Sequence, residues 1–189
     1  MEDIILVGYG GHAKSVADSI QRGKQYRIVG YTDLKPADSQ YVYLGQDEVL
    51  PQYYKKGVKN VAVCIGYLGK GNVRQKMYKY LKDIGYMLPI IKDPSAIISD
   101  DVQIGEGTFV GKNAIINAGA KIGKMVIINT QCLVEHECIV SDFAHIAVSA
   151  VLCGQVYVEE AAFVGANATV IQGKKILKNK IVPAGLTIR

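Results

Sequence analysis

The chain has 189 residues, of which 49% are hydrophobic, and its 22 basic and 17 acidic residues leave a net charge of +5. This length suits two compact units of about 90 residues each, and the absence of any block of five like charges argues against a nucleic-acid-binding arm. The four cysteines form neither a CxxC motif nor a disulfide framework. The N-terminal MEDIILVGYG resembles neither a signal peptide nor a membrane span, so we expect a cytoplasmic protein.

The N-terminal half alternates predicted strands and helices. Strands are expected at 4–8, 27–31, 60–65 and 87–91, separated by a helix ending near Arg22, a short helix at 47–55 and a helix at 71–85. This alternation indicates a small Rossmann-like α/β domain, a parallel sheet with ligand loops after its strands. Pro94 in KDPSAIIS marks a junction, which divides the chain into domains of residues 1–93 and 94–189.

The turn after the first strand is rich in glycine. Residues 8–13 (GYGGHA) fit the pattern G-x-G-x-x-G/A, and Asp33 follows Ala13 by twenty residues. In such a turn the glycines let a diphosphate approach the backbone at a helix N-terminus, while the acid holds a hydroxyl. A domain of about four strands is half of a full dinucleotide-binding unit. The diphosphate of a nucleotide-sugar therefore fits as well as NAD does, and a tight turn without any ligand is a third interpretation.

The second half repeats every six residues. From Ile98 to Ile188 every sixth position is aliphatic, sixteen in succession. A helix turns 600° in six residues, so these side chains would point in three directions and form no single apolar face. A short strand plus a corner, coiled repeatedly, places them all inside a β-solenoid, each stacked on its equivalent about 4.8 Å away.

The position four residues after each aliphatic is also regular. From Val102 to Ala168 it holds twelve small or branched residues in a row, including Cys132 and Cys138. We therefore expect these cysteines to fill corners of the coil and not to act as catalytic thiols. Lys174 and Lys180 interrupt the series, which predicts a shift of phase or a protruding loop within QGKKILKNK.

The repeats resemble the hexapeptide-repeat acyltransferase family, in units such as Ile104-Gly105, Val110-Gly111, Ile122-Gly123 and Val164-Gly165. The resemblance implies a left-handed parallel β-helix with three hexapeptides per coil. It also implies a homotrimer that binds acyl-coenzyme A in the groove between neighbouring subunits.

The whole chain resembles one subfamily, in GYGGHAKSV, the TD after the second strand, IG followed by NVR, DPSA and VEHECIV. These are bacterial sugar acetyltransferases: UDP-4-amino-sugar N-acetyltransferases of the bacillosamine type and related sialic acid O-acetyltransferases. The resemblance implies that the N-terminal domain binds a UDP-amino-sugar. It places Gly10, Gly11 and His12 at the diphosphate or sugar, Thr32 and Asp33 near the uracil, and Gly66 along the pocket. The family often has two acids after the second strand, and Thr32 replaces the first of them here.

His136 and His145 lie nine residues apart, half of an eighteen-residue coil, at outward-facing offsets of the repeat. We therefore expect both to border the same groove between subunits. An amine that attacks a thioester must lose a proton, and imidazole, with an unperturbed pKa of about 6.5, accepts one near neutral pH. We predict that His136 is the general base of a direct transfer from acetyl-CoA, without an acyl-enzyme.

Glu135 or Glu137 would hold the other ring nitrogen of His136 and fix its tautomer. The resemblance favours Glu137, whereas the alternation of side chains along a strand predicts that both glutamates point away. The resemblance places the second histidine beside the thioester, so His145 would position the cofactor. A metal site at these two histidines is the less favoured alternative, because neither has a companion ligand at the usual spacing, and we predict none.

Small residues complete the predicted cofactor site. Gly154 lies one coil, eighteen residues, after His136, where a missing side chain leaves room for the pantetheine arm. The resemblance adds four contacts of coenzyme A: Gly165, Ala166, Ala184 and Gly185.

The favoured function is thus acetyl transfer from acetyl-CoA to the amine of a UDP-amino-sugar. O-acetyl transfer to a sugar hydroxyl, such as that of a sialic acid, is the nearest alternative. A non-catalytic nucleotide-binding trimer, in which the solenoid serves only assembly, is a second. An NAD-dependent oxidoreductase would need a substrate domain that a solenoid does not supply.

Overall fold

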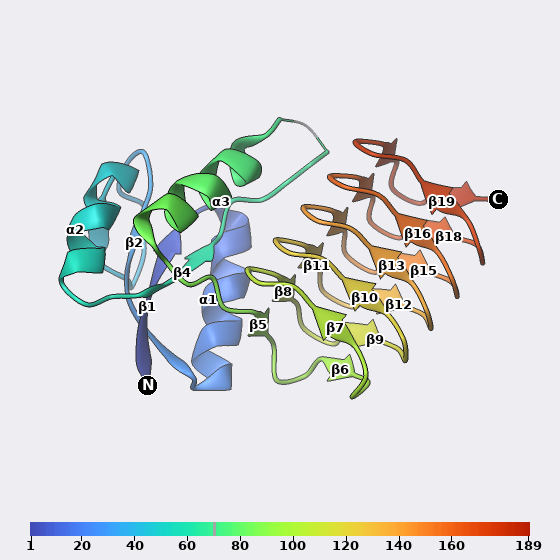
Figure 1. Cartoon of the computed structure of the whole chain (residues 1–189), viewed down its shortest axis with the longest axis horizontal. Helices are drawn as coiled ribbons and strands as arrows, with labels where there is room; N and C mark the ends of the chain where they lie inside the picture. Colours follow the sequence, from blue (N-terminus) through green and yellow to red (C-terminus); the bar gives the residue numbers. More distant parts are fainter. Residues whose placement is uncertain (70) are drawn as a thin grey trace.

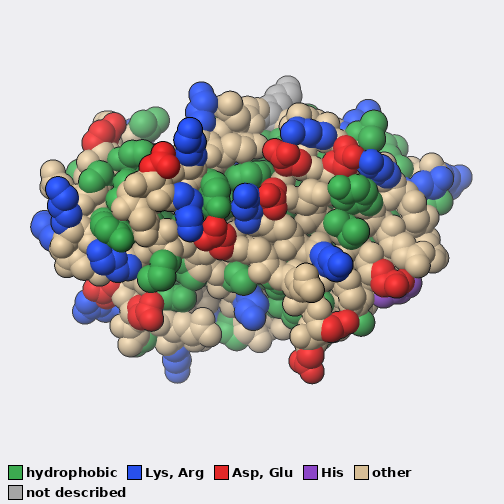
Figure 2. All heavy atoms as spheres, in the orientation of Figure 1, with side chains coloured by type: hydrophobic (Ala, Val, Ile, Leu, Met, Phe, Trp, Pro, Cys, Tyr) green, Lys and Arg blue, Asp and Glu red, His purple; other side chains and the backbone are tan. Residues whose placement is uncertain are grey.

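The structure, a computed structural model, describes residues 1–69 and 71–189. A small α/β unit is followed by a long stack of triangular coils (Figure 1). The predicted fold class, a parallel N-terminal sheet followed by a parallel β-helix, is confirmed. In the face shown in Figure 2, basic and acidic side chains are mixed over both halves and do not gather by sign. None of the helices formed by the described residues is long and apolar enough to span a membrane.

The N-terminal sheet has four parallel strands in the order β3-β2-β1-β4. They are β1 (Glu2–Val7), β2 (Tyr26–Thr32), β3 (Tyr43–Gly45) and β4 (Asn60–Val63), and the helical elements are α1 (Gly11–Gly23), η1 (Asp47–Val49), α2 (Leu50–Lys55) and α3 (Val73–Ile84). The central strand β1 buries Ile4 to Val7 completely. An unbroken apolar run of this kind is typical of a strand covered on both faces.

Two details of this sheet differ from the prediction. The three-residue strand β3 was not expected, and residues 87–91 do not form a strand of the sheet. Met87 makes only an isolated bridge to Asn60, and β5 (Ile91–Lys92) pairs with β8 of the solenoid. The chain leaves the first sheet after Met87 because it must start the first coil, so the solenoid already includes β5, which precedes Pro94.

The solenoid has three parallel sheets, which we name by what they present outward. The domain face, against the N-terminal unit, is β5, β8 (Phe109–Val110), β11 (Ile127–Ile128), β14 (His145–Ile146), β17 (Phe163–Val164) and β20 (Ile181–Val182). The aliphatic face is β6 (Ile97–Ile98), β9 (Ile115–Ile116), β12 (Leu133–Val134), β15 (Val151–Leu152), β18 (Thr169–Val170) and β21 (Thr187–Ile188). The charged face is β7 (Gln103–Ile104), β10 (Lys121–Ile122), β13 (Ile139–Val140), β16 (Tyr157–Val158) and β19 (Lys175–Ile176).

Both series of the six-residue repeat point inward, as predicted. The aliphatic series is buried from Val110 to Val182, and the small-residue series is buried from Thr108 to Ala168. Burial raises the pKa of Cys132 to about 12 and also raises that of Cys138. Both thiols are therefore protonated at neutral pH and fill corners, in agreement with the structural interpretation.

The corners have an unusual backbone. Three residues after each inward aliphatic, from Gly107 to Gly185, the chain adopts φ values between 53° and 72°. Ten of these positions are not glycine, namely Asn113, Met125, Gln131, Glu137, Phe143, Ser149, Gln155, Ala161, Asn167 and Asn179. Each left-handed residue costs on the order of 1–2 kcal/mol relative to a right-handed one. Because the backbone at these positions is left-handed and not extended, the alternation of side chains along a strand ends at every corner.

The prediction of a shift of phase or a protruding loop within QGKKILKNK is wrong. Strands β19 and β20 continue in register with the coil beneath them. Lys174 and Lys180 belong to the final coil of the stack, where no further coil packs over the inward position. Lys180 is exposed and Lys174 is half-buried, so neither charge enters the core.

The N-terminal unit is fixed to the domain face by buried polar contacts. Tyr67 donates from its hydroxyl to the carbonyl of Ala161 at 2.7 Å. Arg74 at the start of α3 donates to the carbonyl of Ile65 at 2.6 Å and to that of Met125 at 2.7 Å. Arg74 is only 2% exposed, so its guanidinium connects the loop after β4 to a solenoid corner inside the protein.

Replacing Arg74 by Met should destabilise the chain. The thioether fills much of the volume but leaves two buried carbonyls without a donor. A hydrogen bond to a charged group is worth about 1.5–3 kcal/mol, so the free energy of unfolding should fall by roughly 3 kcal/mol or more, measured by urea denaturation. Arg27→Met removes an ion pair with Asp3 at an exposed site and should lower the free energy of unfolding far less. Equal effects of the two substitutions would contradict the interpretation.

Candidate active site

A pocket of about 630 Å³ opens at the carboxyl ends of β1, β2 and β4. It is lined by five of the six predicted substrate-binding residues: Gly10, Gly11, His12, Asp33 and Gly66. A parallel sheet places its ligand site at this end, where the strand order reverses direction around β1. Tyr9 and Leu34 line it from the segments after β1 and β2, and the other lining side chains come from the region of η1 and from the segment after β4, which continues into α3.

The N-terminus of α1 faces this pocket, and no side chain caps its first amide groups. Gly10 precedes the helix, no side chain caps it, and its first turn holds no acidic residue. A Cβ atom added to Gly10 or Gly11 would meet nothing within 4 Å. Open space beside uncapped amides at the positive end of the helix dipole suits a diphosphate.

Thr32 and Asp33, both predicted near the base, differ in their surroundings. Thr32 is fully buried, and its hydroxyl donates to Oδ1 of Asp47 at 2.6 Å. Asp33 does line the pocket, but its carboxylate accepts from the backbone N–H groups of Tyr9 and Leu34, each at 2.6 Å. Asp47, which lines the pocket from η1, is the residue that sequence reasoning missed. It follows the short strand β3, for which the sequence gives no clear signal.

His12 offers the pocket an unused ring nitrogen. Its Nε2 is buried without a hydrogen-bond partner, and its ring packs edge-on against Phe109 with centroids 5.3 Å apart. Burial, followed by the nearby charges of Arg74 and His145, lowers the pKa of His12 to about 3. The imidazole is therefore neutral at physiological pH and can hydrogen-bond a bound ligand.

His145 points out of the prism as predicted, but it is not exposed. It lies 6% exposed beneath the N-terminal unit, with Nδ1 2.6 Å from the carbonyl oxygen of Tyr67 and Nε2 3.2 Å from Nδ2 of Asn129. Burial lowers its pKa to about 4. The neutral ring donates from Nδ1 to Tyr67 and accepts at Nε2 from Asn129, so both nitrogens are occupied within the chain.

His136 lies on the opposite side of the prism, at the corner between the aliphatic and charged faces. Its side chain is 50% exposed, with Nδ1 3.3 Å from Oε2 of Glu137. That same oxygen accepts from Nε2 of Gln155 at 3.0 Å. The alternation argument, which aimed Glu137 away from the ring, is wrong because Glu137 has φ 56° and lies in the corner. Glu135 instead accepts from the backbone N–H of His136.

Gly154 borders His136 as predicted. A Cβ atom there would lie 2.6 Å from Cε1 of the imidazole and closer still to Nε2. The missing side chain therefore leaves Nε2 room. Gln155, one coil after Glu137, was not predicted, although the same eighteen-residue step that found Gly154 leads to it.

The other predicted cofactor residues occupy a different edge. They are Gly165, Ala166, Ala184 and Gly185, at the corner between the domain and aliphatic faces. At Gly165 a Cβ would lie 2.5 Å from the backbone nitrogen of Ala184, so glycine allows close stacking there. Ala184 and Gly185 are exposed. Apart from His145, which lies on the domain face, the predicted cofactor residues thus lie on the two edges that border the aliphatic face, and one chain does not bring them together.

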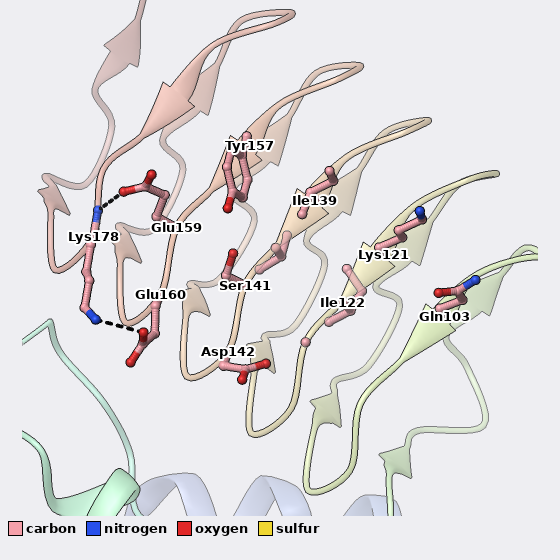
Figure 3. Close-up of a pocket in the computed structure, with 12 residues that line it drawn as sticks. Gln103, Lys121, Ile122, Ile139, Ser141, Asp142, Tyr157, Glu159, Glu160 and Lys178 are labelled. Carbon is pink, nitrogen blue, oxygen red and sulfur yellow. Dashed lines mark hydrogen bonds and ion pairs between the residues drawn. The ribbon is translucent and has the colours of Figure 1, made fainter.

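A second hollow of about 560 Å³ lies on the charged face (Figure 3). None of the predicted site residues lines it. Lys178 donates from Nζ to Glu160 at 2.9 Å and from its backbone N–H to Glu159 at 2.8 Å. Because these charges satisfy one another, the hollow does not demand a ligand. Among residues 1–69 and 71–189, no group of three or more His, Cys, Asp or Glu side chains is placed to hold a metal ion.

Comparison with known proteins agrees with this division of the chain. Residues 3–81 match the family described as PglD N-terminal domain, and residues 101–130 match hexapeptide repeat of succinyl-transferase. A histidine variant of perosamine N-acetyltransferase from Caulobacter crescentus, solved with CoA and GDP-perosamine, is 32% identical with a TM-score of 0.94, covering 100% of this chain and 89% of that one. The chain belongs to the hexapeptide-repeat sugar N-acetyltransferases. The predicted family is therefore confirmed.

Two further relatives of this sugar N-acetyltransferase are also described with GDP-perosamine. PerB from Caulobacter crescentus, in complex with CoA and GDP-perosamine, is 33% identical with a TM-score of 0.92, covering 100% of this chain and 89% of that one. GDP-perosamine N-acetyltransferase of Escherichia coli O157:H7 is 26% identical over 120 residues, 64% of this chain and 52% of the relative. That match spans about half the length of the curated relative.

The two buried histidines make the stability of this sugar N-acetyltransferase sensitive to acid. In the unfolded chain both histidines bind a proton below a pH of about 6.5. In the folded chain the pKa of His12 is about 3 and that of His145 is about 4, so both stay neutral to a much lower pH. Stability is therefore not reduced by these two histidines above a pH of about 6.5, and the free energy of unfolding falls as the pH drops below that value. At pH 5 each histidine should lower the free energy of unfolding by about 2 kcal/mol.

Urea denaturation between pH 7 and 5 measures this slope. His145→Asn and His12→Asn should each remove about half of it. A slope that survives both substitutions would show that other groups are responsible.

Proposed function

We propose that the chain transfers the acetyl group of acetyl-CoA to the amino group of a nucleotide-linked amino-sugar, with His136 as general base. The observation that carries the proposal is the arrangement at the prism edge. Nδ1 of His136 is held by Glu137, and Nε2 faces the bare backbone of Gly154. An imidazole that donates from Nδ1 to a carboxylate keeps the lone pair of Nε2 free to accept a proton.

The chemistry requires no residue beyond this base. The amine nitrogen attacks the thioester carbonyl carbon, Nε2 of His136 takes the amine proton, and the C–S bond breaks to release CoA. Cys132 and Cys138 are buried and protonated, so neither supplies a nucleophile for an acyl-enzyme. The names of the relatives favour N-acetylation over the O-acetyl alternative.

The nucleotide-sugar would occupy the N-terminal pocket. The uncapped start of α1 suits the diphosphate, and His12 offers Nε2 to the sugar. The resemblance found in the sequence implies a UDP-sugar, whereas the relatives are described with GDP-perosamine.

Assembly as a homotrimer would complete the site. The outward side chains of the aliphatic face include Ile97, which is 64% exposed, and Ile115, Leu133 and Val151, which are half-buried and stacked in register. If copies pack through this face in a ring, the edge that carries His136 on one subunit meets the edge that carries Gly165 on the next. Acetyl-CoA would lie between the two edges, with His145 positioning the second edge through Asn129.

Replacing His136 by Ala tests the base. Proton transfer by a positioned side chain contributes about 10²–10⁴-fold, so kcat should fall by that factor. The measurement is thiol release from acetyl-CoA with GDP- and UDP-linked amino-sugars. Glu160→Gln, on the charged face, should retain wild-type turnover. Turnover by His136→Ala at the wild-type rate would remove the mechanism, and no thiol release by the wild type with any amino-sugar would favour the non-catalytic trimer.

Mixing two inactive variants tests the shared site. Gly11→Leu fills the pocket of one chain, and His136→Ala removes the base of another. Co-refolded mixtures should regain a fraction of wild-type turnover, because some interfaces then combine an intact pocket with an intact His136. Mixtures as inactive as their parents, despite exchange of subunits, would show that each chain uses its own base.

A further inference from the structure

The pocket of the N-terminal domain is acidic at one end. Asp33, Asp47 and Glu48 line it from the segments that follow β2 and β3. The lining side chains after β4 include the apolar Leu68, Val73 and Met77. Two different groups of a ligand must therefore fill the two ends.

The position of the solenoid decides which group lies where. The segment after β4 packs on the domain face, where Tyr67 contacts Ala161 and His145. An amino-sugar that receives an acetyl group at the solenoid must therefore lie on the β4 side of the diphosphate. The nucleoside is left with the acidic end beside β2 and β3.

Asp47 is the carboxylate most suited to read a base there. The buried hydroxyl of Thr32 donates to its Oδ1 at 2.6 Å, and the hydroxyl of Tyr80 donates to its backbone carbonyl at 3.2 Å. These contacts fix the orientation of the side chain, while within the described part of the chain no donor reaches Oδ2. Asp33, by contrast, uses both oxygens on backbone N–H groups.

The chemistry of the bases distinguishes the candidates. Guanine presents two adjacent donors, N1–H and the N2 amino group, which a carboxylate accepts as a pair. Uracil presents one N–H between two carbonyl oxygens, which carboxylates repel. One of the two N–H groups of the Gln46 amide donates to the carbonyl of Leu34 at 3.1 Å, which leaves a single N–H for the two carbonyl oxygens of uracil.

We infer that the sugar is carried by a guanine nucleotide and that Asp47, oriented by Thr32, is the residue that selects guanine. This inference rests on the proposed function for the placement of the sugar. It replaces uracil, the base that the family resemblance implies, and moves recognition from Thr32 to Asp47.

Calorimetric titration of the intact protein with GDP, UDP and inosine diphosphate tests the inference. Inosine diphosphate differs from GDP only in lacking the 2-amino group. A correctly paired base edge is worth about 1–3 kcal/mol, so GDP should bind roughly 10–100-fold more tightly than UDP and about 10-fold more tightly than inosine diphosphate.

Asp47→Asn keeps the shape of the side chain but presents an amide where guanine needs an acceptor. The affinity for GDP should fall by roughly 10–100-fold and the affinity for UDP by less than about 3-fold. The affinities for GDP and inosine diphosphate should become nearly equal. Thr32→Val should shift the GDP:UDP ratio in the same direction by a smaller factor, because it frees Asp47 without removing it. Asp83→Asn, the same change on the exposed side of α3, should leave all three affinities unaltered.

The outcomes separate the inference from the proposed function. Equal binding of GDP and UDP, or an equal loss of both in Asp47→Asn, would overturn guanine selection even if acetyl transfer proceeds. Preference for GDP that depends on Asp47 would support it even if thiol release fails with every amino-sugar. No binding of any of the three nucleotides would remove both.

Discussion

The stacking of one branched aliphatic side chain on the equivalent residue of the next coil is the constraint on which the rest of the structure depends. It fixes an eighteen-residue step from Val110 to Val182, so any corner residue has its neighbour one coil away. This step alone places Gly154 beside His136 and Gln155 beside Glu137. The core therefore sets the geometry of the candidate base without contributing a polar atom to it.

A second constraint joins the two halves. Arg74 and His145 are buried where the N-terminal unit meets the domain face. The two terminal nitrogens of Arg74 donate to backbone carbonyls, and both ring nitrogens of His145 have partners. Burying polar groups is tolerable only when their hydrogen bonds are complete. Within the described residues, two buried nitrogens near this interface lack a partner, Nε of Arg74 and Nε2 of His12, and of the two residues only His12 lines the pocket. An orphaned nitrogen in a ligand pocket is what a bound sugar or phosphate would complete.

The sequence predicted the solenoid well because its signal is long, strict and repeated, and because only stacking explains a period of six. Gly10, Gly11, His12 and Gly66 could be placed at the pocket because a glycine turn after a strand has a defined geometry. The hydrogen-bond contacts of Thr32 and Glu137 could not be predicted from the local sequence. The first depends on Asp47, fifteen residues away, and the second on a left-handed backbone at a non-glycine corner. Contacts of that kind arise from tertiary structure and not from local pattern.

The loop after β4 belongs to both halves, because Ile65 and Leu68 line the pocket while Tyr67 lies against the solenoid. One apolar cluster extends from Ile4 through Tyr67 to Phe109 and Ile127. A chain cut at the architectural boundary would expose Phe109 and Ile127, which are now 5% and 1% accessible. The two halves are therefore separate in architecture but form a single cooperative folding unit, and a nucleotide held in one half must stabilise both against unfolding.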